Sequence, residues 1–378
     1  MKFVIAPDSF KGSMTAKEAA VAIQVGLQKI YPDADYELVP MADGGEGTVQ
    51  SLVDATDGDI ITANVQNPLD ETVTAFYGVL GDGQTAVIEM SAASGIQFVT
   101  EETKNPLITT TFGTGQLIKD ALDRGLRRFI IGLGGSATND GGAGMAEALG
   151  VRFLDENGQQ IARGGAPLAQ LVKLDMGHLD PRVAESEFLL ASDVTNPLIG
   201  ETGASAVFGP QKGATAAMVA ELDAALTNYA KVIKTQIGVD LANTPGAGAA
   251  GGLGAGMLAF TQAKMQSGIS LVVAATALVA KSANADVAFV GEGAIDFQTQ
   301  YGKTPMGAAQ AIKQASPDAK VIGLAGYVGD GIDALYDLGI DAVFGILPGA
   351  VDLPTAMKAG EANLTRTAEN IARLLNTK

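Results

Sequence analysis

The sequence of 378 residues is long enough for two domains, and its 47% hydrophobic and 18% charged content is typical of a folded globular protein rather than a disordered one. Acidic residues outnumber Lys and Arg by 42 to 25, and the formal charge of −17 argues against binding to nucleic acid or to an anionic membrane surface. The absence of cysteine excludes disulfides, thiolate metal sites and cysteine nucleophiles.

The N-terminal region predicts two strand–loop–helix units. The apolar run Phe3–Ala6 is the first strand, and Thr15 with Glu18 forms a capping box that begins the first helix. Tyr36–Met41 is the second strand and Thr48–Ala55 the second helix.

No segment is predicted to enter a membrane or a secretory pathway. Phe3–Ala6 is too short for a signal peptide and lacks a cleavage-like site. The longest apolar segment, Ile269–Ala280, is shorter than the roughly 18 residues that a membrane span needs. We therefore expect a cytoplasmic protein.

The middle of the chain has a different pattern. Three strand-like runs, Ile60–Val65, Thr72–Val79 and Thr85–Met90, are separated by turn residues, as in a meander. The elements predicted after them are a helix over Thr114–Arg124, strands over Phe129–Leu133 and Phe188–Ala191, and a long helix over Ala214–Ile237.

The alternation of strand and helix returns near the C-terminus. Val287–Val290, Val321–Gly326 and Ala342–Leu347 each begin a strand-helix unit. With the first two strands they make five, the number in a flavodoxin-like doubly wound parallel sheet. We therefore expect an α/β protein of two domains, a discontinuous one over residues 1–58 and 286–378 and an inserted one over 59–285.

A glycine-rich turn lies between the strand Phe129–Leu133 and a short helix over Met145–Leu149. Its glycines leave backbone N–H groups accessible to an anion, and its hydroxyl, amide and carboxylate groups suit a phosphorylated ligand with a metal ion. An ordinary polar loop is an equally good interpretation of this segment alone. The candidate nucleotide- or phosphate-binding residues are Gly134, Gly135, Ser136, Thr138, Asn139, Asp140, Gly141 and Gly142.

Two other segments resemble nucleotide motifs without their context. Gly246–Gly251 matches G-x-G-x-x-G, but no buried strand precedes it and no acidic residue follows it before Asp286, so glycine packing or a second anion loop is favoured. Tyr301–Thr304 resembles the end of a P-loop, but Phe297 stands where its first glycine belongs. Lys303 is a candidate phosphate ligand before a helix, although a solvated loop lysine is the simpler interpretation.

Five acidic residues follow predicted strands. Because such positions meet at the carboxyl edge of a parallel sheet, Asp8, Asp43, Glu46, Glu292 and Asp296 are expected to bind Mg²⁺ or substrate hydroxyls there. Lys11 and Lys212 are candidate anion partners. The single histidine, His178, has nothing nearby to orient it, so a Ser-His-Asp triad is not expected.

Several segments together resemble the bacterial glycerate kinases of the glycerate- and galactarate-utilisation type. The resemblance extends from the first strand to the last helix. The matching segments are Ala6–Gly12, Ala42–Thr48, Asn105–Leu107, Thr110–Gly115, Ile131–Gly144, Ser192–Leu198, Val207–Gly213, Pro245–Gly252 and Gly291–Asp296.

The resemblance implies ATP-dependent phosphorylation of D-glycerate to 2- or 3-phosphoglycerate, with ATP and Mg²⁺ as cofactors. It also implies that the inserted domain has a restriction-endonuclease-like core with a mixed sheet. One departure is visible, because the family usually has arginine where this chain has Ala294.

Phosphoryl transfer needs positioning, cations around the transferred group and a carboxylate near the attacking hydroxyl. We assign the base to Asp193, which follows a predicted strand, and a catalytic charge to Lys11; Lys303 would bind phosphate. Asp193 and Glu292 are the candidate metal ligands. The candidate substrate-binding residues are Asp8, Ser9, Asp43, Glu46, Asn196, Glu292 and Asp296.

Other interpretations stay open. A kinase for another small hydroxy acid or a sugar would share these features, as would a non-catalytic flavodoxin-like module that binds FMN, although no Trp and only seven Tyr are available to stack on a flavin. The sequence leaves open which set of residues holds ATP and which holds glycerate. It also leaves the oligomeric state open, with a homodimer as one candidate.

Overall fold

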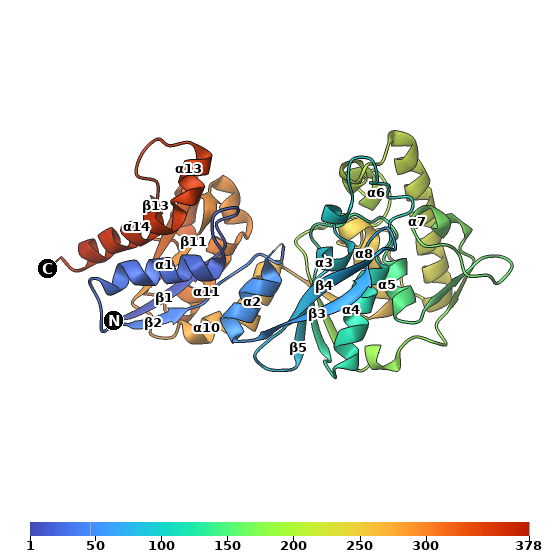
Figure 1. Ribbon diagram of the computed structural model, residues 1–378, viewed down its shortest axis with the longest axis horizontal. Helices are drawn as coiled ribbons and strands as arrows, with labels where there is room; N and C mark the ends of the chain where they lie inside the picture. Colours follow the sequence, from blue (N-terminus) through green and yellow to red (C-terminus); the bar gives the residue numbers. More distant parts are fainter. Residues whose placement is uncertain (46, 378) are drawn as a thin grey trace. The chain divides into compact units, whose positions relative to one another are not determined.

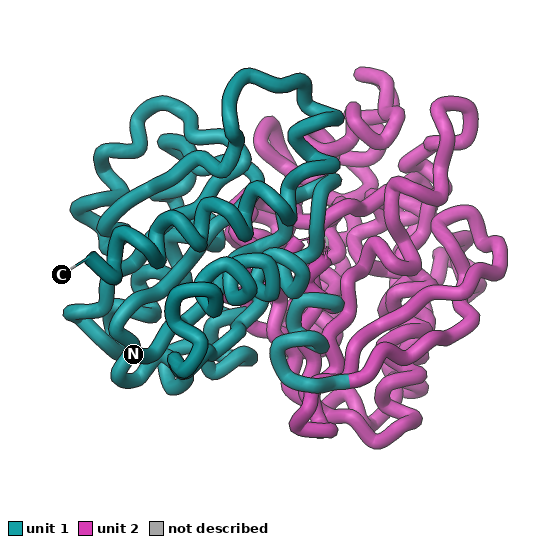
Figure 2. The backbone as a smooth tube through the Cα atoms, turned by 60° about the vertical axis from the view of Figure 1, so that its left-hand side comes forward, with its two compact units in different colours: residues 1–43, 50–58, 269–378 teal, residues 44–49, 59–268 magenta. Residues whose placement is uncertain are grey.

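The computed structural model describes residues 1–45 and 47–377. The chain forms two compact units (Figure 2): unit 1 is residues 1–43, 50–58 and 269–378, and unit 2 is residues 44–49 and 59–268. The return to unit 1 comes earlier than the predicted residue 286, because the helices α9 (Gly268–Ala275) and α10 (Leu278–Lys281) pack there. Lys281 donates from Nζ to the carbonyl of Ala55 at 3.2 Å, which joins α10 to the end of α2 (Thr48–Thr56).

Unit 1 contains one five-stranded sheet in which every neighbouring pair is parallel. The order is β13-β12-β11-β1-β2, so β1 lies inside the sheet, between β2 and the central strand β11 from the C-terminal third of the chain. The strands are β1 (Lys2–Pro7), β2 (Asp35–Leu38), β11 (Val287–Ile295), β12 (Lys320–Val328) and β13 (Ala342–Gly345).

Helices cover both faces of this sheet (Figure 1). Phe3 and Ile5 of β1 belong to a core with α1 (Ala16–Gln28) and α14 (Gly360–Leu375), which lie side by side. The alternate residues of β1 point to the other face, where α11 (Thr304–Ala315) contacts β1, β11 and β12. The shorter elements of unit 1 are η5 (Phe297–Tyr301), α12 (Asp333–Leu338) and α13 (Leu353–Lys358).

Unit 2 is built on a mixed six-stranded sheet of order β10-β9-β6-β5-β4-β3. The first three strands form the predicted meander, with β3–β4 and β4–β5 antiparallel, and the other pairs are parallel. The strands are β3 (Asp59–Gln66), β4 (Thr72–Val79), β5 (Thr85–Glu89), β6 (Arg128–Gly132), β9 (Glu187–Ala191) and β10 (Lys264–Gln266), and β7 (Arg152–Leu154) pairs separately with β8 (Lys173–Asp175).

One hydrophobic core joins this sheet to its helices. Phe129 of β6 and Phe188 of β9 are neighbours in the register, and their rings stack with centroids 4.5 Å apart. Leu117, Met145 and Tyr229 bring three different helices into the same core. The helices of unit 2 are α3 (Ser91–Ser94), η1 (Ile96–Phe98), α4 (Phe112–Asp123), α5 (Ala143–Ala148), η2 (Ala166–Gln170), η3 (Pro181–Val183), α6 (Ala204–Phe208), η4 (Pro210–Lys212), α7 (Ala216–Ile237) and α8 (Ala249–Phe260).

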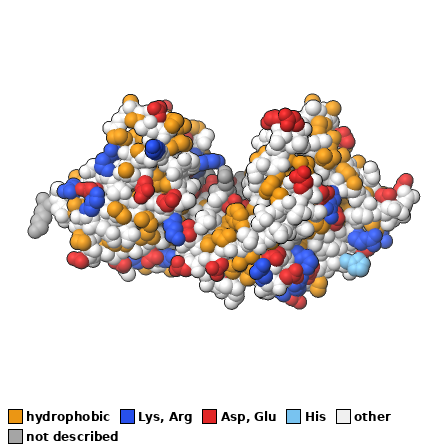
Figure 3. Space-filling model, in the orientation of Figure 1, with side chains coloured by type: hydrophobic (Ala, Val, Ile, Leu, Met, Phe, Trp, Pro, Cys, Tyr) orange, Lys and Arg blue, Asp and Glu red, His pale blue; other side chains and the backbone are white. Residues whose placement is uncertain are grey.

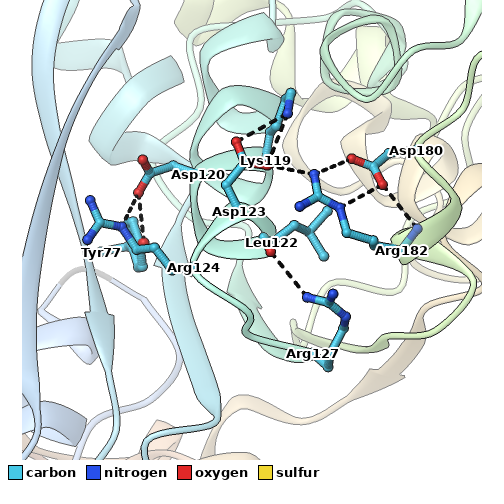
Figure 4. A network of polar contacts seen from close by, with 9 residues as sticks. All are labelled: Tyr77, Lys119, Asp120, Leu122, Asp123, Arg124, Arg127, Asp180 and Arg182. Carbon is cyan, nitrogen blue, oxygen red and sulfur yellow. Dashed lines mark hydrogen bonds and ion pairs between the residues drawn. The ribbon is translucent and has the colours of Figure 1, made fainter.

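Polar contacts secure the C-terminal end of α4 (Figure 4). Asp120 accepts hydrogen bonds at 2.8 Å from both Tyr77 and Arg124, which links α4 to β4. On the other side of the helix, Arg182 donates to Asp123 at 2.6 Å, and this contact holds the pKa of Asp123 below its usual range. The network therefore ties the helix to segments before and after it in the sequence.

Acidic and basic side chains are interspersed on the face drawn in Figure 3. Within residues 1–45 and 47–377, no helix combines the length and apolarity that crossing a bilayer requires.

One predicted element differs in a way that matters for the site. We expected the strand that begins at Val287 to end at Val290, followed by a loop over 291–296, but β11 continues to Ile295. The register pairs Glu292 with Ala325, so the long strand β12 supplies a hydrogen-bonding partner along this extension. Glu292 is therefore held by the sheet itself.

Candidate functional site

The carboxyl edge of the unit 1 sheet brings Asp8 and Glu292 together. β1 ends at Pro7, which is in register with Gly291 of β11. The backbone N–H of Asp8 then donates to the carbonyl of Gly291 at 2.8 Å. Two acidic side chains that are far apart in the sequence thus project from adjoining positions of neighbouring strands.

Asp8 is held by short hydrogen bonds. Its Oδ2 accepts from the hydroxyl of Thr304, the first residue of α11, at 2.6 Å, and its Oδ1 accepts from the backbone N–H of Ser9 at 2.6 Å. Burial nevertheless raises the pKa of Asp8 to about 6, because these hydrogen bonds only partly offset the lost hydration and Asp43 adds repulsion.

Glu292 contains an unpaired buried atom. Its Oε1 is inaccessible to solvent and has no hydrogen-bond partner. Burial raises the pKa of Glu292 to about 7; Lys303 lowers it, whereas the charges of Asp8, Asp43 and Asp296 raise it further. A carboxylate kept in this state is typical of a functional site rather than of a stabilising contact.

Lys303 supplies positive charge at the same edge. It is the N-cap residue of α11, and its Nζ lies 3.7 Å from Oδ1 of Asp296. Asp296 also caps η5, where it accepts from the backbone N–H of Gln298 at 2.8 Å. Thr304 is the first residue of the helix, and its hydroxyl binds Asp8 rather than a backbone group of α11.

The remaining predicted residues of this edge differ in their exposure to solvent. Ser9 is half-buried, and Lys11 and Asp43 are exposed. Glu46 lies outside the described residues. In the part of the chain that is described, no group of three or more acidic or histidine side chains is arranged to hold a metal ion.

The glycine-rich turn in unit 2 is only partly accessible. Gly134 and Gly135 are exposed and Ser136 is half-buried. The carbonyl of Gly135 accepts from the backbone N–H of Ile96 at 2.8 Å, which pins this bend to η1. The other candidate residues are buried: Thr138, Asn139, Asp140, Gly141 and Gly142.

Asp140 organises the buried half of the turn. Its carboxylate accepts from the backbone N–H and the hydroxyl of Thr111 at 2.8 Å, and from the backbone N–H groups of Gly142 and Gly144 at 3.1 and 3.2 Å. Complete burial raises the pKa of Asp140, while these hydrogen bonds oppose the rise. A ligand would have to displace these bonds to reach the carboxylate, so in this conformation the exposed bend Gly134–Ser136 is the part that can meet a phosphate.

The second glycine motif packs directly beneath this turn. Gly251 has φ of +68° and Gly252 has φ of +88°, inside α8, and a Cβ on Gly251 would collide with the carbonyl oxygen of Thr138. A Cβ on Gly252 would lie 2.8 Å from Cα of Gly141. These close approaches support glycine packing, one of the two uses expected of the G-x-G-x-x-G segment.

The candidate base lies elsewhere in unit 2. Asp193 follows β9 and is exposed. Asn196 is half-buried, and its amide donates to the carbonyl of Thr202 at 2.8 Å. Of the two predicted anion partners in this protein, Lys11 is exposed but Lys212 is only 1% exposed.

Sequence reasoning missed the two threonines whose hydroxyl groups donate hydrogen bonds to Asp8 and Asp140. Thr304 binds Asp8, and Thr111 binds Asp140. The sequence marks the segment Thr110–Gly115 only by its resemblance to a family. No local signal separates a threonine that donates to a distant carboxylate from one on the surface.

Comparison with known proteins gives a consistent result. The model of the glycerate kinase family matches residues 3–376. Glycerate kinase of Halalkalibacterium halodurans is 53% identical over 369 residues, which are 98% of this chain and 97% of that protein. Glycerate 2-kinase of Escherichia coli is 48% identical over 375 residues, with 99% and 98% covered. A crystal structure from Salmonella typhimurium LT2, of a protein provisionally described as glycerate kinase 2, has a TM-score of 0.90 at 48% identity and covers 99% of this chain and 98% of its own.

The packing of α8 beneath the turn makes Gly251 hard to replace. We expect Gly251→Ala to lower the free energy of unfolding by roughly 3 kcal/mol or more, because the methyl group meets the Thr138 carbonyl and φ is positive. Gly238→Ala is the control, since Gly238 has φ of +77° with open space around its Cβ position, and about 1 kcal/mol is expected there. Urea unfolding followed by circular dichroism measures the free energy of unfolding of both variants. Equal losses of stability in the two variants would contradict the steric collision at Gly251.

The raised pKa of Glu292 has a consequence for stability. The folded state binds this proton more tightly than the unfolded state, so the stability it contributes is complete below pH 4.5 and is lost as pH rises to about 7. Glu292→Gln should therefore raise Tm at pH 8 by roughly 2–5 °C and change it little at pH 5. Differential scanning fluorimetry at both pH values tests this, with Glu187→Gln on the surface of β9 as the control. An increase that is the same at both pH values would be inconsistent with burial of the charge.

Proposed function

Because the chain belongs to the glycerate kinase family, we propose that it transfers the terminal phosphoryl group of ATP to D-glycerate and produces phosphoglycerate and ADP. The observation that carries this proposal is the family match over residues 3–376, which includes nearly all of both units. The name of the relative from Escherichia coli, glycerate 2-kinase, favours the 2-hydroxyl as the acceptor.

At the unit 1 edge, we assign substrate binding to Asp8, Ser9, Asp43, Glu292 and Asp296. Carboxylate oxygens that are hydrogen-bonded or unpaired can accept from the hydroxyls of glycerate. Lys11 and Lys303 would offset the negative charge of the carboxylate or of a phosphate. Glu46, which follows the second predicted strand in the sequence, remains a candidate substrate-binding residue.

The residues of this edge also fit Mg²⁺. Glu292 has a buried oxygen without a partner, and carboxylate oxygens are the ligands that Mg²⁺ prefers. Mg²⁺ typically takes one or two protein carboxylates together with substrate phosphates, so the absence of a three-carboxylate group among the described residues is compatible with it. When bound, the ion would neutralise phosphate charge. Glu292 is the proposed ligand at this edge, and Asp193 of unit 2 is a separate candidate ligand.

In unit 2, we assign the nucleotide phosphates to the exposed bend Gly134–Ser136, with the buried residues up to Gly142 as its support. Asp193 would accept the proton of the glycerate hydroxyl while the new P–O bond forms and the bond from the γ-phosphorus to ADP breaks. Its exposure leaves it accessible to a substrate, and Asn196 lies close in sequence to orient a hydroxyl.

The finer description of the fold is also a proposal. The strand order of unit 1, counted along its five strands, is 2-1-3-4-5, which supports a flavodoxin-like domain. The mixed six-stranded sheet supports a restriction-endonuclease-like core for unit 2. A cytoplasmic location and a homodimeric state remain proposals that rest on the sequence.

The substrate can be tested with a panel of hydroxy acids and sugars incubated with ATP and Mg²⁺, with ADP release as the signal. We expect D-glycerate to give the highest kcat/KM, and phosphorus NMR to identify 2-phosphoglycerate. A sugar or another hydroxy acid as the preferred substrate would refute the assignment to glycerate, and 3-phosphoglycerate as the product would change only the acceptor hydroxyl.

The base can be tested by Asp193→Asn. We expect kcat to fall by about 10²-fold or more with little change in KM, because the amide keeps the shape but cannot accept the proton. Asp240→Asn, at an exposed ion pair with Lys234, is the matched control and should leave kcat unchanged. Full turnover by Asp193→Asn would remove this residue from the role.

A further inference from the structure

Lys212 is a buried cation that the proposed reaction does not use. It is the last residue of η4 and is 1% exposed. Its Nζ donates to the carbonyl of Thr138 at 2.6 Å. Burial lowers the pKa of Lys212 to about 7, and the attraction of Asp140 opposes this shift. An ammonium group in such a position is costly, so its contact with Thr138 is a specific feature of the fold.

The carbonyl of Thr138 lies two residues after the exposed bend Gly134–Ser136. On one side of it lies Lys212, and on the other lies the backbone of Gly251, which leaves no room for a Cβ. Next to it, the backbone N–H of Ala137 donates to the carbonyl of Ser94 at 3.0 Å. Two residues before the bend, the carbonyl of Gly132 accepts from the backbone N–H of Met90 at 3.0 Å. The bend Gly134–Ser136 is therefore anchored at both ends, and Lys212 supplies the only charged anchor among these contacts.

The buried part of the turn contains two polar side-chain atoms without a hydrogen-bond partner. Oγ1 of Thr138 and Oδ1 of Asn139 are buried and have no hydrogen-bond partner. Unsatisfied groups favour rearrangement toward solvent. The hydrogen bond from Lys212 opposes such a rearrangement at the Thr138 backbone.

Direct contact with a ligand does not explain Lys212. Its side chain is buried and its ammonium group donates to the carbonyl of Thr138, whereas the accessible part of the turn is Gly134–Ser136. An effect of Lys212 on an anion must therefore pass through the backbone that it holds.

We propose that Lys212 is a positioning residue: by holding the carbonyl of Thr138, it fixes the bend Gly134–Ser136 in the conformation that receives an anionic substrate. This inference rests on the proposed function for the identity of that anion, which we assign as ATP. Because the bend is already fixed, it loses less conformational entropy when the anion binds. Loss of the anchor should therefore weaken binding of the anion more than it slows the chemical step.

The test compares Lys212→Met with Lys104→Met in the full-length protein. Lys104 is the matched control, because its aliphatic chain lies beside Gly213 while its Nζ pairs with Glu101 at 2.6 Å. We expect KM for ATP to rise at least tenfold in Lys212→Met, with a smaller change in kcat, and to stay within twofold in Lys104→Met. Hydrogen–deuterium exchange should be faster over residues 134–142 in Lys212→Met only.

Each outcome decides the proposal. A rise in KM confined to glycerate would support positioning and show that the bend receives that anion instead. Unchanged KM values, or a fall in kcat that only follows a lower Tm, would overturn it. If Lys212→Met does not fold, Lys212→Gln, which is uncharged and too short to keep the contact, replaces it. A wild-type protein that does not phosphorylate glycerate would refute the proposed function alone, since binding of a fluorescent ATP analogue still compares the variants.

Discussion

The parallel pairing of β1 with β11 is the interaction on which the unit 1 edge depends. It aligns Ala6 with Val290 and Pro7 with Gly291, and so joins residues that are separated by the whole of unit 2. Asp8, Glu292 and the N-terminus of α11 gather at one edge because of this register. A shift by one residue would turn Glu292 to the other face of the sheet.

The two units hold their acidic residues in different ways. In unit 1, the carboxyl groups of Asp8 and Glu292 are incompletely stabilised as anions. Burial raises the pKa of both, and one oxygen of Glu292 has no hydrogen-bond partner. In unit 2, Asp140 is saturated by the backbone and by Thr111. The first arrangement leaves groups available for a ligand, whereas the second builds a rigid base below an exposed bend.

Much of the fold could be predicted, because the patterns that define it are local. The strand predicted over Thr72–Val79 is β4 residue for residue, and the capping box at Thr15 begins α1. The predicted end of β11 at Val290 was wrong. Gly291 and Gly293 are typical of a loop, and pairing with β12, which is distant in sequence, keeps them in the strand.

The site was predictable by residue type but not by environment. The sequence places a glycine, a hydroxyl or a carboxylate at a bend, yet it does not say which side of the bend faces inward. Thr138 to Asp140 are buried because Gly251 and Lys212 approach them from remote parts of unit 2. The same limit applies to Lys212, whose charge indicated an exposed anion partner although the fold encloses it.

The position of β1 between β2 and β11 constrains the order in which the unit 1 sheet can form during synthesis. β1 and β2 are synthesised first, but β11, the inner neighbour of β1, follows more than two hundred residues later. At about 10 residues per second on a ribosome, the N-terminal strands wait on the order of 20 s with an unpaired edge. Unit 2 is nearly continuous in sequence and can fold during that interval, so the first domain to begin is the last to be completed.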